Sequence, residues 1–211
     1  MELNTRLWSV VLPAILSQLV LLMMETISML FVGRLDSTYA TAGVGLGIIY
    51  VNCTTQSTLT GLNNAISVLV AVAYGKRDIQ ECERILHRGR IICFICYLPL
   101  FIVELLCYPA MVAIGVDPEV ASYASSFSLW LYFAMGFHMQ FDCYRQYLNA
   151  TNQSKVVQYA VSSTLVIHLI VCYFLTVKLN YGVSGVAAAS MVTCALNMLY
   201  VMGYTWRMTE I

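Results

Sequence analysis

The chain has 211 residues, of which 60% are hydrophobic and only 10% are charged, and its mean hydropathy is +0.75. Ordinary soluble domains carry about 25% charged residues, so this composition excludes a typical water-soluble fold. The 11 Lys and Arg residues balance the 11 Asp and Glu residues, and the net charge of zero gives no indication of a nucleic-acid partner.

The apolar residues come in blocks that are long enough to cross a hydrocarbon core of about 30 Å. The sequence therefore predicts an all-α membrane protein, a bundle of six transmembrane helices in a single domain covering residues 1–211. The first block is too long for a cleaved signal sequence and is interpreted as a retained membrane helix. The predicted spans are approximately residues 8–33, 42–74, 90–114, 121–147, 156–178 and 183–206.

Short connections separate these spans. Residues 33–37 break the first pair, and Gly75 is predicted to end the second span. Residues 75–88 are expected to form the longest and most charged connection. Before the fourth span, Asp117 is predicted as the N-cap and Pro118 as the first helical residue. Residues 149–154 and 180–182 form the remaining turns.

The basic residues predict how the chain is oriented. If the N-terminus is cytoplasmic, the inner side holds Arg6, Lys76, Arg77, Arg84, Arg88, Arg90, Arg145, Lys155 and Arg207, and the outer side holds only Arg34 and Lys178. Cytoplasmic loops are enriched in Lys and Arg. Both termini are therefore expected in the cytoplasm, with the chain in the plasma membrane or in a vacuolar or other internal membrane.

Polar residues recur along the second span at spacings of four, four, three and four. They are Asn52, Gln56, Thr60, Asn63 and Ser67. This spacing predicts that they share one helical face. Lipid cannot satisfy their hydrogen bonds, so the face must meet a wet cavity or other helices. We expect a cavity wall, and interhelical hydrogen bonds that only hold the bundle together are the alternative.

Two glutamate side chains fall inside predicted spans, where an ionised side chain costs about 2.5 kcal/mol or more. Glu25 lies near the middle of the first span, with Gln18 and Ser28 on the same side of the helix, and Glu104 lies near the middle of the third. All four are candidates for binding substrate or a proton. The alternative for each carboxyl group is a protonated or hydrogen-bonded structural residue.

Other polar groups inside the spans are more ambiguous. Asp142 and Arg145 are three residues apart, which favours a local ion pair. His138 and His168 could line a cavity or form hydrogen bonds in the core. His168 joins the candidates for substrate or proton binding.

No metal or catalytic site is predicted. The eight cysteines fall mostly within apolar blocks, and the Cys93-x-x-Cys96 pair lacks further ligands at suitable spacing. No nucleophile has a positioned base, so the chain is not expected to be an enzyme or to carry a cofactor. The spacing of Gly43 and Gly47, and small residues near Gly185, predict close helix packing.

Several motifs, in their order along the chain, resemble those of the multidrug and toxic compound extrusion (MATE) family, and its eukaryotic branch in particular. They are SMLFVGRLD, GLNNAISVLVAVAYGKRD, VDPEVASYASSF, RQYLNATNQS and GVSGVAAAS. The resemblance covers nearly the whole chain. It implies a pair of six-helix lobes with substrate between them, of which this chain supplies the N-terminal lobe.

The resemblance also implies export of organic, often cationic compounds in exchange for H⁺ or Na⁺. The coupling carboxylate of eukaryotic members is expected in the second lobe. The chain departs from the family pattern in the first lobe. Ser28 replaces the aspartate of many prokaryotic members, and Cys172 and Thr176 fall on the Asn and Asp of the fifth helix. A prokaryotic type of carboxylate site is therefore not expected.

Further departures lie in the first two spans. Val72 replaces a glutamine, Ser67 stands where plant-like members often have Asp, and Glu25 falls where those members tend to have Gln. Compared with the family pattern, Glu25 thus adds a carboxyl group to the first span.

The leading hypothesis is an H⁺-coupled efflux antiporter, or the N-terminal lobe of one. The expected partners are membrane lipids, a small organic substrate that is expected to be cationic, H⁺ or Na⁺ as the coupling ion, and a second lobe or a second copy. One alternative is a half-size lobe that transports nothing and acts as an assembly partner. Another is a lipid-linked sugar flippase of the same superfamily, which is disfavoured because no Lys or Arg lies in the middle of a span.

Overall fold

The chain folds into a bundle of long helices. The computed structural model describes residues 2–34 and 38–209, and these residues contain no strand. The elements are α1 (Glu2–Val32), α2 (Thr38–Val51), the π-helical turn η1 (Asn52–Gln56), α3 (Ser57–Gly75), α4 (Ile79–Leu105), α5 (Cys107–Ala113), α6 (Pro118–Ala150), α7 (Ser154–Tyr173), the π-helical turn η2 (Phe174–Lys178) and α8 (Gly182–Thr209). The predicted all-α class is confirmed.

Each predicted span corresponds to one helical pass, although three passes are interrupted. The second span consists of α2, η1 and α3, the third of α4 and α5, and the fifth of α7 and η2. Five segments in the described part are long and apolar enough to cross a membrane: Val11–Val32, Thr38–Gly75, Ile79–Leu105, Ser154–Lys178 and Gly182–Arg207. The remaining pass, α6, is equally long but more polar.

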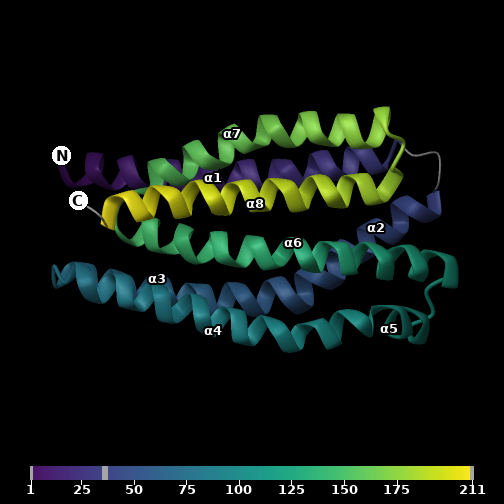
Figure 1. Ribbon diagram of the computed structural model, residues 1–211, viewed down its shortest axis with the longest axis horizontal. Coiled ribbons are helices and arrows are strands. Elements are labelled where there is room, and N and C mark those ends of the chain that lie inside the picture. Colours follow the sequence, from purple (N-terminus) through teal and green to yellow (C-terminus); the bar gives the residue numbers. More distant parts are fainter. Residues whose placement is uncertain (1, 35–37, 210–211) are drawn as a thin grey trace.

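The polarity of α6 is explained by its central position. It packs against α2, α3, α4, α5, α7 and α8, and lies between the α1, α7 and α8 group and the α3–α4 pair (Figure 1). Its polar residues Ser128 and Asp142 are buried. Neighbouring helices, rather than lipid, therefore surround most of the polar groups on this helix.

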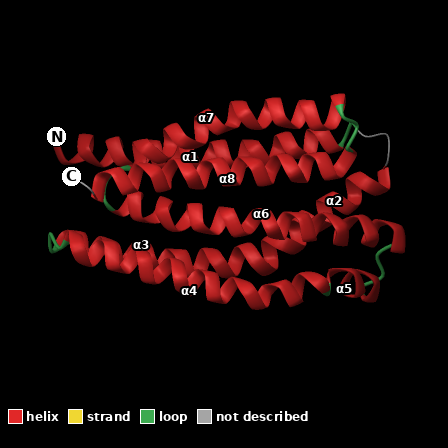
Figure 2. Cartoon of the chain, viewed as in Figure 1, coloured by secondary structure: helices red, strands yellow, loops and turns green. Residues whose placement is uncertain are grey.

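The passes alternate in direction along the long axis of the bundle (Figure 2). The described chain ends, the α3–α4 turn and the α6–α7 turn all lie at one end, and the α5–α6 and α7–α8 turns lie at the other (Figure 1). Lys76 and Arg77 of the α3–α4 turn and Lys155 at the start of α7 thus lie at the same end, and Arg84 and Arg88 follow in the N-terminal part of α4. Which side of a membrane this end faces stays a prediction, and the side chain of Arg6 and residues 35–37 lie outside the described residues.

The helix boundaries confirm one predicted cap and correct one predicted loop. Asp117 Oδ1 accepts a hydrogen bond from the Glu119 amide at 2.8 Å, with Pro118 as the first helical residue. The prediction of a long connection over residues 75–88 is wrong, because α4 begins at Ile79. Asp78 Oδ1 accepts from the Glu81 amide at 3.0 Å and so caps the charged first turns of this helix.

The turn before α4 and the break after it have local causes. Gly75 is the last residue of α3, as predicted, but the left-handed residue of the turn is Arg77, with φ of 61°. The helix of the third pass is interrupted at Leu106. Pro109 lacks an amide hydrogen, and its ring would clash with the carbonyl of Leu105 in a continuous helix.

Glycines hold α2 close to α6. A Cβ atom at Gly43 would lie 2.5 Å from Tyr123 Cβ, and one at Gly47 would lie 2.9 Å from the Ala124 carbonyl oxygen. These contacts involve backbone or Cβ atoms, which cannot turn away. The predicted role of the Gly43-x-x-x-Gly47 pair in close packing is therefore supported by the geometry.

Substitution of either glycine should loosen this interface. We expect Gly43→Ala and Gly47→Ala each to destabilise the bundle by about 1–3 kcal/mol, because the added methyl group overpacks the contact. Gly45→Ala on the same helix is the control, since its Cβ would meet only Met29 Cε at 3.7 Å. Thermal unfolding in detergent measures the difference, and equal midpoints for the three variants would contradict the assignment.

Candidate transport cavity

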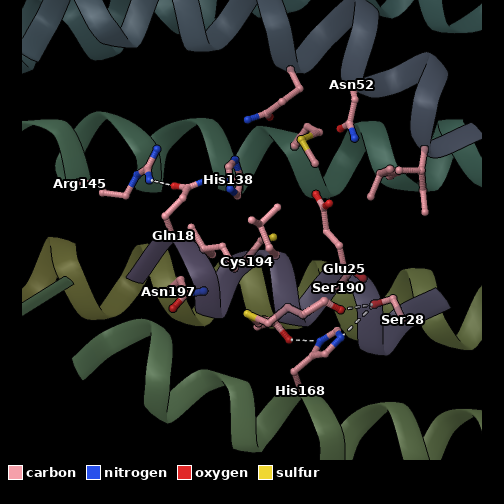
Figure 3. A pocket seen from close by; sticks show the side chains of 18 of the residues that line it. Gln18, Glu25, Ser28, Asn52, His138, Arg145, His168, Ser190, Cys194 and Asn197 are labelled. Atoms are coloured by element: carbon pink, nitrogen blue, oxygen red, sulfur yellow. Dashed lines mark hydrogen bonds between the residues drawn. The ribbon is translucent and has the colours of Figure 1, made fainter. Parts of the chain in front are cut away.

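A cavity of about 150 Å³ opens between α1, the α2–η1 segment, α6, α7 and α8 (Figure 3). Its walls are largely apolar, with Met24, Leu131 and Met135 among them. Polar side chains enter from every one of these elements. Such a combination of apolar walls and a few convergent polar groups is typical of small-molecule sites.

The structure separates the predicted site residues into two groups. Those that line the cavity are Gln18, Glu25, Ser28, Asn52, Gln56 and His168. Those that do not are Thr60, Asn63, Ser67 and Glu104. The functional role of each residue in either group stays a prediction.

The polar stripe of the second span is divided along its length, between the π-helical turn η1 and α3. Asn52 and Gln56 lie in this turn and line the cavity, whereas Asn63, in α3, is buried between α4 and α6. Gln56 Nε2 donates to Thr60 Oγ1 at 3.3 Å, so these two residues lie together as their spacing predicts, but only the first part of the stripe reaches the cavity.

Glu25 brings an unpaired carboxyl group to the cavity. Its side chain extends from α1 toward the side of the cavity on which Asn52 lies (Figure 3). The residue is exposed, and within the described part of the chain no hydrogen bond or ion pair holds its carboxyl group. The carboxyl group therefore borders the cavity without being held by another described side chain.

Arg145 is the one Lys or Arg among the residues that line the cavity. Its guanidinium is already bound by other side chains. It forms an ion pair with Asp142, as predicted, and its guanidinium also donates to Gln18 Oε1. Asn63 Nδ2 donates to the other oxygen of Asp142 at 2.8 Å. This network ties α1, α3 and α6 together and neutralises Arg145.

Asn63 forms hydrogen bonds from both ends of its side-chain amide. Its Oδ1 accepts from the thiols of Cys93 (3.2 Å) and Cys143 (3.1 Å), while its amide holds Asp142. The side chain is 1% exposed. The sequence left interhelical hydrogen bonds as the alternative to a cavity wall, and Asn63 forms such bonds.

His168 joins three helices next to the cavity. Its Nε2 lies 3.1 Å from Ser28 Oγ of α1, and its Nδ1 lies 2.9 Å from Thr193 Oγ1 of α8. Each hydroxyl also donates to a carbonyl oxygen of its own helix, Ser28 to Met24 (3.1 Å) and Thr193 to Ala189 (2.8 Å).

This arrangement suits both charge states of the imidazole. When both hydroxyls donate to their carbonyl groups, each can only accept from His168, so both ring nitrogens carry hydrogen. A neutral ring needs one donor in return, which Ser28 supplies by turning its hydroxyl, or Cys172 supplies from its thiol 3.4 Å from Nε2. A single hydroxyl rotation therefore accommodates gain or loss of a proton.

The polar wall formed by α8 was not predicted. It consists of Ser190, Thr193, Cys194 and Asn197. These residues are spaced i, i+3, i+4 and i+7, which is the pattern of one helical face and could have identified them. His138 and Arg145 of α6 also line the cavity, although the sequence had suggested only a possible cavity position for His138 and an ion pair for Arg145.

Known proteins share this architecture. The structure of the eukaryotic MATE transporter AtDTX14 matches with a TM-score of 0.92 at 22% identity, over 95% of this chain and 45% of that chain. A MOP superfamily transporter from Pyrococcus furiosus matches with a TM-score of 0.82 at 17% identity, over 92% of this chain and 43% of that chain. The fold is that of one half of a MATE-type membrane transporter.

The family follows from the sequence comparison. The MatE family model matches residues 13–174, and the chain belongs to this family. Protein DETOXIFICATION 23 of Arabidopsis thaliana is 26% identical over 193 residues, and Protein DETOXIFICATION 51 of the same plant is 28% identical over 200 residues. These matches cover 90% and 95% of this chain but only 38% and 37% of the relatives, so the chain spans less than half their length.

The different roles of Asn63 and its neighbour can be tested. We expect Asn63→Ala to destabilise the bundle by about 1–3 kcal/mol, because it leaves buried Asp142 without its amide partner. Asn64→Ala is the matched control, since Asn64 is exposed and, among the described residues, its side chain accepts only from Gln146, at 3.2 Å. Both are compared by thermal unfolding in detergent. Loss of stability in Asn64→Ala alone would refute the structural role given to Asn63.

Proposed function

We propose that this chain is the cavity-bearing, N-terminal lobe of an H⁺-coupled exporter of organic cations. The observation that carries the proposal is the unpaired carboxyl group of Glu25 in a largely apolar cavity. Apolar walls bind the hydrocarbon parts of a ligand, and the carboxylate attracts a positive charge. The names of the DETOXIFICATION relatives support export of foreign compounds.

The charges around the cavity favour a cation over an anion. Arg145 is neutralised by Asp142 and held by Gln18, whereas Glu25 has no such partner among the described residues. A lipid-linked sugar with phosphate groups would need free basic side chains. The flippase alternative therefore has less support from this cavity.

Export requires a second half. Alternating access in transporters of repeated architecture comes from rocking of one lobe against another around a central site. In this proposal, a second six-helix lobe or a second copy of this chain covers the open side of the cavity where Glu25 is exposed. A lobe that binds no ligand would support the alternative of an assembly partner.

Proton coupling would act through His168. A proton on the imidazole places a positive charge beside the cavity that receives the organic cation. Like charges repel, so the protonated lobe releases the cation and the neutral lobe binds it. Proton and substrate would thus compete, which is what exchange of one for the other requires.

The role of Glu25 is tested by binding of ethidium, an organic cation, to the chain in lipid nanodiscs. We expect Glu25→Gln to weaken binding about tenfold, corresponding to about 1.4 kcal/mol, because the substitution removes the charge and keeps the shape. Glu119→Gln, at the exposed start of α6, is the control and should bind like the unaltered chain. Equal affinity in both variants would remove Glu25 from the site.

The role of His168 is tested by the pH dependence of the same binding. Affinity for ethidium should fall as the pH is lowered from about 8 to about 5, the range in which histidine gains its charge. His168→Gln should flatten this dependence, whereas His87→Gln, on the exposed start of α4, should preserve it. A pH profile that survives His168→Gln unchanged would assign the proton elsewhere.

A further inference from the structure

Glu104 is buried at the C-terminal end of α4, with 0% of its surface exposed, and does not line the cavity. Its Oε1 accepts hydrogen bonds from the hydroxyls of Thr54 at 3.0 Å and Thr55 at 2.7 Å. Its Oε2 is also inaccessible, and no described residue forms a hydrogen bond with it. Half of the hydrogen-bonding capacity of this carboxyl group is therefore unused.

No positive charge compensates Glu104 in the described part of the chain. The titratable groups that face it are Tyr50 of α2, Tyr97 of α4, Cys107 of α5 and Tyr132 of α6. No basic side chain contributes to its surroundings, and no ion pair includes it. An ionised carboxylate at this depth would be a buried, uncompensated charge, which is the most costly state for such a group.

The hydrogen bonds are also too few for an ionised group. A carboxylate can accept about four hydrogen bonds. The single hydroxyl hydrogen of Thr54 is shared with the Tyr50 carbonyl oxygen at 2.8 Å, so only Thr55 donates without competition. A proton on Oε2 removes the charge, and the neutral hydroxyl left behind costs less to bury than the charge did.

We propose that Glu104 is a proton-binding site, in which a neutral carboxylic acid carries its proton on Oε2 and accepts from Thr55 on Oε1. The site is separate from the His168 network and from the cavity. It rests on its own geometry, so it stands or falls independently of the proposed export of cations.

The position of the site connects it to the cavity wall. The five residues of η1 present Asn52 and Gln56 to the cavity, and the same turn supplies Thr54 and Thr55 to Glu104. Loss of the proton would require new donors for Oε2. These can come only from water or from rearrangement where η1 meets the interrupted end of α4, at Leu105 and Leu106. Proton release at Glu104 would therefore act on the turn that holds both cavity amides.

Infrared spectroscopy of the 211-residue chain in lipid nanodiscs tests the proposal, because a protonated carboxylic acid has a carbonyl stretch distinct from that of a carboxylate. We expect a protonated-acid band at neutral pH that Glu104→Gln abolishes. Glu119→Gln, an exposed glutamate on α6, is the control and should leave the band intact. A Glu25→Gln spectrum identifies any contribution from the carboxyl group in the cavity.

A second variant keeps the test decisive if Glu104→Gln does not fold. Thr55→Val preserves the shape of the side chain and removes the donor to Oε1, so the carbonyl stretch of a protonated Glu104 should move to higher frequency. Thr58→Val on the exposed side of α3 should not move it. The proposal is overturned if the protonated-acid region of the spectrum is unchanged by Thr55→Val, or by a folded Glu104→Gln.

Discussion

Hydrogen bonds that the protein must satisfy by itself govern this structure, because lipid offers neither donors nor acceptors to a polar group within the bilayer. The effect is clearest at α6, the most polar of the long helices. The negative charge of Asp142 is balanced by Arg145 of the same helix, and Asn63 of α3 donates a hydrogen bond to its carboxylate. The Tyr97 and Tyr132 hydroxyls donate to each other's backbone carbonyls across the α4–α6 contact. α6 can be polar because six other helices enclose it.

Against this background, three side chains are the candidate sites. Glu25 has an unpaired carboxyl group at an open cavity, His168 has a hydrogen-bond network that fits two charge states, and Glu104 has one carboxyl oxygen without a partner. The turn η1 lies between Glu25 and Glu104. A π-helical turn is often found at functional positions, and here it supplies side chains to two sites at once.

Much of the fold could be predicted from the sequence, because length and apolarity determine where a chain can cross a bilayer. The Asp117 cap and the Asp142–Arg145 pair are local in sequence, and both were predictable from spacing. The charged residues 75–88 predict a loop, but Asp78 caps a helix whose first turns are charged, so α4 begins earlier than expected.

The site is harder to predict. Spacing along one helix does not reveal which part of a polar stripe borders a cavity and which part faces neighbouring helices, so Asn63 was not distinguishable from Asn52 and Gln56. The α8 wall, in contrast, was readable from the spacing of Ser190, Thr193, Cys194 and Asn197.

We propose that the cavity bordered by Glu25 and Asn52 receives an organic cation. A cryo-electron microscopy map of the chain in nanodiscs with bound tetraphenylphosphonium would show where the ligand lies. Density for the ligand is expected beside the Glu25 carboxyl group, within the walls formed by α1, η1, α6 and α8. Density elsewhere on the bundle, with the cavity empty at saturating ligand, would contradict it.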